Sequence, residues 1–352
     1  MRKTFKYRLY PKPRQAETLE HWLDLCRCLY NACLEQRKVA LEKHRRITKY
    51  DQMLELPELK REMPEYREVD AQALQDVVDR LDKAFQRFFA GGGFPKFKGR
   101  RHYSSITFKQ TSWKLTDGRL HIRGCGPIKV RWSREIRGTI KTVTIRRTKS
   151  GKWYVCFSCD DVPPAVYPAT NKVVGIDLGL ECLVTTSDGE RLGDTKYLRR
   201  KLRHLRRIQR HLARQQKGSK RRAKTVRQLA RQHEKISNQR MDMHHKISTK
   251  LVREYAEIHH ENLNPQFMLH NRRLARTATD MAWGQFLTFL RTKAAAAGRK
   301  LVAKNPRGTS QECHACGRVV PKKLSDRWHK CECGVSLHRD HNAALVVLKR
   351  PA

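Results

Sequence analysis

The chain has 352 residues and a formal net charge of +42, with an isoelectric point of about 10.4. A charge this one-sided repels itself unless a polyanion compensates it, which predicts nucleic acid as the partner and a large phosphate-binding surface. Hydrophobic residues make up 39% of the chain, which argues against general disorder. Because the sequence shows no apolar run near 20 residues and no secretory signal, we expect a cytoplasmic protein with no membrane partner.

The first half of the chain is predicted to combine helices with a β-rich domain. Residues 5–10 alternate as a strand, and apolar residues recur at helical spacing over 15–34 and over 69–89. The apolar stripe of the second segment is typical of a helix that faces a core. Alternation resumes from 103 to 159, which predicts a β-barrel of the OB type that includes the first strand.

A basic loop at 94–101 follows a break of three glycines and interleaves aromatic with basic residues. This composition suits contacts with phosphates and with stacked bases. A solvated linker explains the same composition equally well. The candidate nucleic-acid contacts in this loop are Lys96, Lys98, Arg100 and Arg101.

A short apolar segment at 173–180 is the first candidate site. It reads as a buried strand that ends in Asp177 and turns at Gly179. A buried carboxylate is costly unless it is hydrogen-bonded or holds a cation, so Asp177 is a candidate ligand for Mg²⁺. From this segment alone, a capping or turn aspartate is an equally good interpretation. Residues 182–186 and a turn at 187–189 complete a hairpin.

Residues 196–235 form a long basic segment, which we interpret as a helical hairpin around Gly218 and Ser219. Glu234 is its only acid. Like charges four residues apart destabilise a helix, so neutralisation by a nucleic-acid duplex explains the segment better than a solvated face does. The candidate phosphate contacts on it are Arg203, Arg207 and Arg210.

Two further acids follow in the C-terminal part. Glu261 lies near the end of a strand-like segment at 256–263, and Asp340 lies in the first turn of an apolar helix. The neighbouring His259 and His260 are not predicted to form a zinc pair, because successive strand residues point to opposite faces. A helix at 283–297 and a strand at 300–303 lie between the two acids.

Two acids near the ends of strands are followed by a third acid at the start of a helix. This order resembles that of the catalytic acids in the RNase H-like nucleases of the RuvC type. Four motifs make the resemblance specific: Gly175-Ile176-Asp177-Leu178-Gly179, Glu261-Asn262-Leu263, Thr309-Ser310-Gln311 and Arg339-Asp340-His341-Asn342-Ala343-Ala344. With them the chain is similar to the TnpB-type transposon-associated nucleases, the compact relatives of type V CRISPR effectors. The resemblance implies an α+β multidomain fold with a RuvC-like α/β nuclease domain, an inserted zinc knuckle, a β-barrel wedge domain and a small helical recognition lobe.

The resemblance also implies domain boundaries. The expected parts are residues 1–10 as the first wedge strand, 11–93 as the recognition lobe, 94–170 as the wedge barrel, 171–305 as the nuclease domain with the basic hairpin, 306–336 as the zinc knuckle and 337–352 as the C-terminal nuclease helix. In this arrangement the knuckle folds the segment that delivers Asp340.

Four of the eleven cysteines have the spacing of a metal knuckle: Cys313, Cys316, Cys331 and Cys333. Paired thiolates on glycine-bearing turns can surround one Zn²⁺, and four protein ligands make such a site structural. The second pair has one intervening residue where two are common in the family, so His314, His329 or His338 remains an alternative ligand. The other seven cysteines are expected to be reduced, without a second zinc site.

The resemblance implies hydrolysis of phosphodiester bonds with two Mg²⁺ ions. Asp177 would contact both ions, Glu261 and Asp340 would each complete one, and Arg339 is a candidate contact to the cut strand. The implied function is that of an RNA-guided DNA endonuclease encoded by a transposable element, with guide RNA and double-stranded DNA as partners and a monomer as the favoured state. A nuclease-inactive RNA-guided repressor and a compact type V CRISPR effector remain alternatives, whereas a transposase proper is disfavoured.

Overall fold

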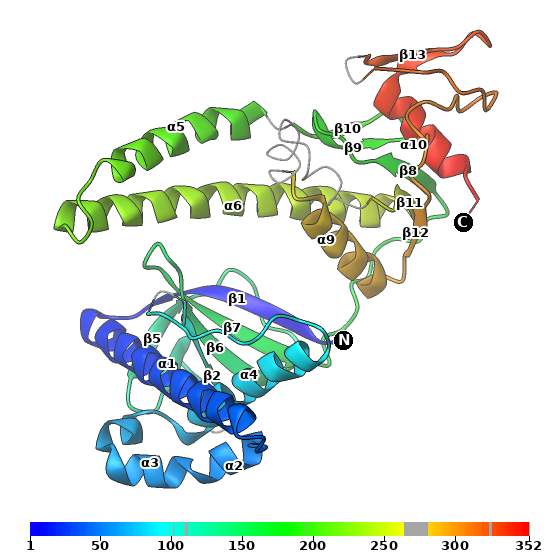
Figure 1. Ribbon diagram of the computed structural model, residues 1–352. Helices are drawn as coiled ribbons and strands as arrows, with labels where there is room; N and C mark the ends of the chain where they lie inside the picture. The colour runs from blue at the N-terminus through cyan, green and yellow to red at the C-terminus, as the bar shows by residue number, and fades with distance from the viewer. Residues whose placement is uncertain (101, 110–111, 195, 264–280, 324–325, 352) are drawn as a thin grey trace. The chain divides into compact units, whose positions relative to one another are not determined.

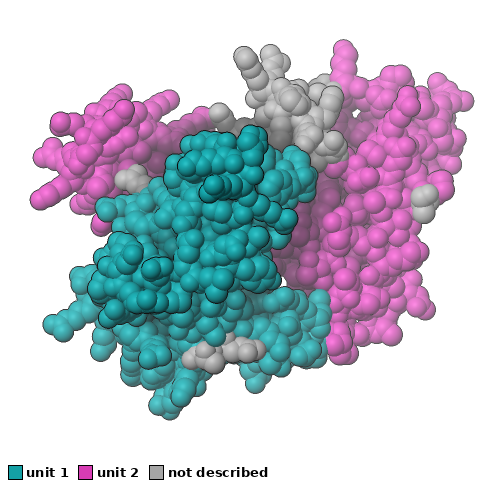
Figure 2. Space-filling model, turned by 60° about the horizontal axis from the view of Figure 1, so that its bottom comes forward, with its two compact units in different colours: residues 1–163 teal, residues 164–352 magenta. Residues whose placement is uncertain are grey.

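The computed structural model describes residues 1–352 except 101, 110–111, 195, 264–280, 324–325 and 352 (Figure 1). The chain forms two compact units, Met1–Pro163 and Pro164–Ala352 (Figure 2). Each unit has its own hydrophobic core. Among the described residues, no helix is both long enough and apolar enough to cross a membrane.

The first unit is built on a seven-stranded antiparallel sheet. Its strands are β1 (Lys3–Tyr10), β2 (Ser105–Phe108), β3 (Trp113–Thr116), β4 (Arg119–Ile122), β5 (Gly126–Arg131), β6 (Thr139–Arg147) and β7 (Trp153–Asp160). They are ordered β2-β6-β7-β1-β5-β4-β3. The prediction that the first strand joins a sheet of later sequence is confirmed, because β1 pairs with both β5 and β7.

This sheet curls into a nearly closed barrel. Trp113 on edge strand β3 packs against Phe157 on β7, with ring centroids 6.3 Å apart. In a flat sheet with strands about 4.8 Å apart, the four strand spacings between them would put these residues about 19 Å apart. Curling therefore brings the inner side chains of distant strands into one core.

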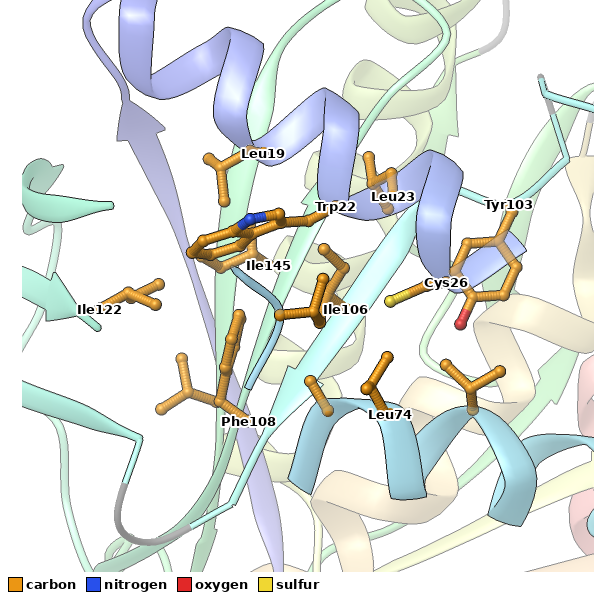
Figure 3. Packing of buried hydrophobic residues seen from close by; sticks show 14 of the residues in the cluster. Leu19, Trp22, Leu23, Cys26, Leu74, Tyr103, Ile106, Phe108, Ile122 and Ile145 are labelled. Carbon is orange, nitrogen blue, oxygen red and sulfur yellow. The ribbon is translucent and has the colours of Figure 1, made fainter. Parts of the chain in front are cut away.

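Helices cover this sheet and share its core. They are α1 (Pro13–Glu42), α2 (Lys49–Leu54), α3 (Leu56–Glu62), the 3₁₀ helix η1 (Pro64–Glu68) and α4 (Ala71–Phe89). Asp70 caps α4 by accepting hydrogen bonds from the backbone N–H groups of Gln72 and Ala73. Trp22 of α1 packs on Phe108 of β2 with ring centroids 6.5 Å apart (Figure 3). Because helices and barrel form one compact unit, the expected boundaries within it stay predictions.

The second unit holds a mixed five-stranded sheet ordered β10-β9-β8-β11-β12. Its strands are β8 (Val173–Asp177), β9 (Cys182–Thr186), β10 (Arg191–Asp194), β11 (Glu257–Glu261) and β12 (Lys300–Lys304). The first three strands pair antiparallel as a meander, and β11 pairs parallel with both β8 and β12. The carboxyl ends of β8 and β11 therefore meet at one edge of the sheet.

Helices α6 (Lys220–Glu254) and α9 (Trp283–Ala296) lie on one face of this sheet and α10 (Arg339–Lys349) lies on the other. Helix α5 (Lys196–Ala213) packs along α6, and a small hairpin of β13 (Trp328–Lys330) and β14 (Ser336–His338) precedes α10. Val174, Ile176 and Ile258 pack into the core that α6 and α9 supply. Helix α10 packs against the opposite face, on β8, β9 and β11.

The predicted basic hairpin is confirmed as α5 and α6. Gly218 supplies a positive φ of 89° at the turn, and Ser219 caps α6 by accepting from the N–H of Arg222. Arg222 in turn donates from Nη1 to the carbonyl oxygen of Leu212 at 2.6 Å, which satisfies a terminal carbonyl of α5. Helix α6 extends to Glu254 instead of ending at 235, because its last turns are buried in the core of the unit.

Candidate functional site

Two of the three predicted acids lie side by side at the ends of parallel strands. The register pairs His260 of β11 with Ile176 of β8, so Glu261 comes opposite Asp177. Residues paired across parallel strands point to the same face, here the face covered by α10. Both acids are buried: Asp177 is only 8% exposed and Glu261 is only 5% exposed. The sheet thus brings two acids together that are far apart in the sequence.

The third acid, Asp340, lies in the first turn of α10. His338 caps this helix, because its Nδ1 accepts from the N–H of Asp340 at 3.2 Å. A β-carbon on Gly179 would lie 3.6 Å from Oδ2 of Asp340, which puts this carboxylate beside the turn that follows Asp177. Asp340 is 5% exposed. All three predicted acids therefore meet in one buried cluster.

The cluster is electrostatically unfavourable without a cation. The pKa of Asp177 is raised well above its usual value, first by burial and then by the neighbouring charges of Glu261 and Asp340. Burial also raises the pKa of Glu261, although a hydrogen bond from Thr309 and the charge of Arg350 act in the opposite direction. Buried like charges of this kind are stabilised by bound hard cations, for which carboxylate oxygens are the preferred ligands. The residues present therefore fit Mg²⁺.

Thr309 and Arg339 are the polar partners of this cluster. The hydroxyl of Thr309 donates to Oε1 of Glu261, and Nε of Arg339 donates to Oδ1 of Asp340 at 3.4 Å. Thr309 belongs to a motif that the sequence singles out, but its contact with Glu261 was not predicted. That contact depends on the path of the loop after β12, which no local pattern specifies.

The two adjacent histidines of β11 point to opposite faces, as predicted. His259 faces α10, where its Nδ1 lies 3.3 Å from the carbonyl oxygen of Leu348, and its Nε2 lies 2.7 Å from Glu257. The ring of His260 lies on the other side, with Nδ1 2.8 Å from its neighbour's carbonyl oxygen. Burial lowers the pKa of His260, so its ring is favoured in the neutral form.

The four predicted cysteines come together in a second cluster. The Sγ atoms of Cys313, Cys316, Cys331 and Cys333 all lie within 4.8 Å of one another. Two of the pairs, Cys313 with Cys333 and Cys316 with Cys331, are 3.6 Å apart. Tetrahedral Zn²⁺ with bonds of about 2.3 Å requires sulfur–sulfur distances of about 3.8 Å, so the residues present fit one structural zinc ion. Among the described residues, no other group of three or more His, Cys, Asp and Glu brings its ligand atoms this close to one another.

Two glycine turns and one asparagine position the cysteine cluster. Gly317 and Gly334 have φ values of 72° and 92°, which residues with a β-carbon rarely adopt. Asn342 of α10 is fully buried, donates from Nδ2 to the carbonyl oxygen of Glu312 at 2.6 Å, and accepts from the N–H of His314. The knuckle is therefore fastened to the helix that carries Asp340. His314 and His338 are two of the histidines that the sequence leaves as alternative zinc ligands. In the structure the Nδ1 atom of each contacts a residue of α10.

The predicted basic contacts lie on exposed or half-buried positions. Lys98 is anchored to α1, because the side chain of Asn31 pairs with its backbone at 2.8 and 3.1 Å. Arg100 forms an ion pair with Asp24 at 3.4 Å, Lys96 is exposed, and Arg101 lies outside the described residues. On α5, the predicted contacts Arg203, Arg207 and Arg210 are all exposed. A role for any of them in binding nucleic acid remains a prediction.

Comparisons with known protein families cover most of the chain. A model described as "Probable transposase" matches residues 156–272, and one described as "Cas12f1-like, TNB domain" matches 283–347. A third, described as "Helix-turn-helix domain", matches residues 1–46. Within 1–46 the structure has strand β1 and the single long helix α1, not two helices joined by a turn.

Relatives match over nearly the full length. The chain is 36% identical to a protein of Streptomyces pristinaespiralis named "Putative RNA-guided DNA endonuclease", over 99% of this chain and 89% of that protein. It is 28% identical to a protein of Escherichia coli K12 named "Putative RNA-guided DNA endonuclease InsQ", over 98% of this chain and 91% of that protein.

Among solved structures, the chain resembles the mini-RNA-guided endonuclease CRISPR-Cas phi3. The TM-score is 0.52 at 10% sequence identity, and the match covers 100% of this chain and 93% of that one. At this identity the likeness concerns the fold alone. The assignment of the chain to a family rests on the first relative, which matches at 36% identity across almost the whole chain. The chain belongs to the TnpB-type family of transposon-associated RNA-guided nucleases.

Proposed function

We propose that this protein is an RNA-guided DNA endonuclease encoded by a transposable element, which cuts double-stranded DNA beside a short flanking motif. The observation that carries the proposal is the convergence of Asp177, Glu261 and Asp340 in one buried cluster within a chain of net charge +42. Buried acids this close are costly unless they bind cations, and the basic surface supplies the field that holds a polyanion nearby. A nuclease-inactive repressor would not require this cluster.

The three acids would hold two Mg²⁺ ions. Asp177 interacts electrostatically with both other acids, which makes it the ligand that both ions would share. When bound, the ions would activate the attacking water and stabilise the leaving oxygen. Thr309 orients the Glu261 carboxylate through its hydroxyl, and Arg339 beside Asp340 would contact a phosphate of the cut strand. The cysteine cluster would hold one structural Zn²⁺ and so fix the start of α10.

The guide and the target would bind separate features of the protein. Base pairing with the guide RNA would read the target sequence, while the protein would bind duplex geometry and the flanking motif. The α5–α6 hairpin and the loop at 94–101 offer exposed basic side chains for phosphates. The protein would then bind one guide RNA and the target DNA in the cytoplasm. One protein monomer on each RNA is the simplest assembly.

Sequencing of RNA that co-purifies with the full-length protein tests this function. We expect one dominant RNA with a constant scaffold next to a variable guide. The complex should then cut a plasmid library that carries the matching target beside randomised flanking bases, and only in the presence of Mg²⁺. A heterogeneous RNA pool without a shared scaffold would contradict RNA guidance, and cleavage in EDTA would contradict the metal mechanism.

A further inference from the structure

Two arginines from separate segments converge on one carboxylate beside the acid cluster. Nη2 of Arg191 lies 3.1 Å from Oε2 of Glu181, and Nη2 of Arg327 lies 3.1 Å from Oε1 of the same side chain. Arg191 begins β10, Glu181 lies in the turn between β8 and β9, and Arg327 precedes β13. The nuclease mechanism gives these three side chains no role.

The backbone places this group close to one of the catalytic acids. Glu181 follows Gly179 by two residues, and a β-carbon on Gly179 would lie 3.6 Å from Oδ2 of Asp340. The carbonyl oxygen of Arg327 accepts from the N–H of Arg339 at 2.8 Å, and Arg339 directly precedes Asp340. The segments that carry the acid and one of its two arginines therefore both lie beside Asp340.

The position between the two guanidinium groups suits an anion with two oxygens. A phosphodiester shares one negative charge between two oxygens, as a carboxylate does, and guanidinium groups bind both kinds of anion through their N–H donors. Two positive groups that face one point also favour an anion at that point. Glu181 therefore occupies a position that equally suits a phosphate of a nucleic-acid strand.

The contacts of Glu181 are weak enough to be exchanged. The three side chains are between 40% and 43% exposed, and exposed ion pairs contribute little to stability because water and salt screen them. These two pairs are therefore poor candidates for holding the knuckle in place. A nucleic-acid strand that binds the same arginines also releases counterions from its phosphates, which favours the exchange.

We propose that Arg191 and Arg327 form a phosphate-binding site for the DNA strand that is cut, and that Glu181 fills this site until the strand displaces it. The proposal rests on the proposed nuclease function for the identity of the strand. Guide pairing holds a target strand near the site at a high effective concentration, whereas a free strand has no such advantage. Glu181 thus disfavours unguided DNA.

Binding of a short DNA strand to variants of the full-length, guide-loaded protein can test the proposal. Every sample carries Asp177→Asn, so that nothing is cut, and this protein is the parent. Glu181→Gln removes the competing charge and keeps the length of the side chain. Glu190→Gln is the matched control, because Glu190 also forms an exposed ion pair, with Lys250. The probe is a fluorescein-labelled oligothymidylate that does not match the guide, and its anisotropy is measured across a salt series.

Glu181→Gln should bind the probe more tightly than the parent. Each exposed ion pair contributes a factor of about 1.4–5, so the loss of two pairs should tighten binding by about 2–30-fold. Glu190→Gln should change the affinity by less than about twofold.

The two arginines should behave in the opposite way. Arg191→Gln and Arg327→Gln should each weaken binding and lower the salt slope by about 0.7, the value for one phosphate contact to a single strand. When both arginines are replaced, the further change Glu181→Gln should have no more effect than Glu190→Gln, because the carboxylate then has no site to compete for.

Cleavage by chains that keep Asp177 separates this role from a structural one. Glu181→Gln should lower the DNA concentration for half-maximal cleavage and leave the maximal rate unchanged. If the two ion pairs instead held the knuckle, their loss would displace Asp340 with the start of α10. A lower maximal rate at an unchanged half-maximal concentration would therefore contradict the proposal.

Two results of the binding experiment would also overturn it. Binding by Glu181→Gln that is no tighter than by Glu190→Gln would remove the inhibitory role. Salt slopes equal to that of the parent in both Arg191→Gln and Arg327→Gln would remove the phosphate site, and this comparison decides if Glu181→Gln does not fold. If the wild-type protein cuts no DNA, the nuclease function fails, and the binding comparison still decides whether the phosphate site exists.

Discussion

The β-carbon that Gly175 lacks would lie 2.2 Å from the backbone carbonyl oxygen of Ala344, so strand β8 and helix α10 meet backbone to backbone. Asp177 follows Gly175 by two residues on the same face of β8, and Asp340 precedes Ala344 by one helical turn. This contact therefore sets the spacing of two acids that belong to distant parts of the chain.

Gly175→Ala should force β8 and α10 apart. The new methyl group would also lie 2.8 Å from the backbone nitrogen of Leu348, and overpacking of this kind costs about 1–3 kcal/mol. We expect a lower unfolding temperature than in the wild type. We also expect cleavage to fall by more than the loss of stability explains, because Asp340 moves with α10. Gly284→Ala in α9 is the matched control, since nothing lies within 4 Å of its added carbon. Equal behaviour of the two variants would contradict the role of this contact.

The Mg²⁺ concentration that cleavage requires should depend on pH. Burial and neighbouring acids raise the pKa of Asp177, and burial raises that of Glu261, so protons compete with metal ions at both carboxylates. The Mg²⁺ concentration for half-maximal cleavage should therefore rise as the pH falls. Titrations of Mg²⁺ at several pH values measure this midpoint, and a midpoint that does not change with pH would contradict a buried carboxylate site.

The same raised pKa predicts the sign of a stability effect in the metal-free protein. Between the unfolded pKa of Asp177, near 3.8, and its higher folded value, the folded state binds more protons than the unfolded state. The unfolding free energy should therefore decrease as the pH rises through this interval. Asp177→Asn removes the titrating group, so denaturant unfolding in EDTA should show a weaker decrease in the variant than in the wild type.

Cys316→Ser should remove zinc without touching the acids. Loss of a thiolate ligand lowers the free energy of metal binding, which is part of the folding free energy of a knuckle. Zinc content and thermal stability of the second unit should fall, and cleavage should fall indirectly. Cys28→Ser is the control, because Cys28 is also exposed but lies outside the cluster. Full zinc content and full activity of Cys316→Ser would show that this residue is not a ligand.

Replacement of Arg203, Arg207 and Arg210 by Gln should weaken binding electrostatically. Arg and Gln have similar helix propensities, so α5 should remain folded. Each lost phosphate contact should lower the salt slope of affinity by about 0.7–0.9, so three should lower it by about 2–3. The same triple change to Lys keeps the charge and should keep the slope. Titration of the guide-loaded protein with target DNA across a salt series decides whether these arginines face phosphates.

The sequence predicted which residues meet in the two clusters better than it predicted what surrounds them. Asp177, Glu261 and the four cysteines were identified because strand ends, glycine turns and ligand spacing are local patterns. The hydrogen bond from Thr309 to Glu261 and the contact of Gly175 with Ala344 were not predicted, because both join segments that only the folded chain brings together. His329 was considered as a ligand, and its contact with Lys322 required the structure.

In the fold, too, the features with a local sequence pattern were predicted and those that depend on distant contacts were not. The strand β1 and the basic hairpin follow from alternation and charge, and the structure contains both. The sequence predicts a shorter α6, because the last turns of this helix are helical through burial against α9 and β10 rather than through local propensity. The short helices α2 and α3 also carry too few residues for a periodic pattern.

The central claim is that the buried acids catalyse cleavage, and Asp177→Asn tests it most directly. Asn has the shape of Asp without its charge, so the fold and the binding surfaces should persist while the proposed Mg²⁺ site would lose the carboxylate of Asp177. Cleavage and binding of a guide-matched DNA should be measured on the same preparations of variant and wild-type complexes. The account predicts undetectable cleavage with target affinity within about twofold of the wild type, a difference below about 0.5 kcal/mol. Cleavage at the wild-type rate by the Asp177→Asn complex would contradict it.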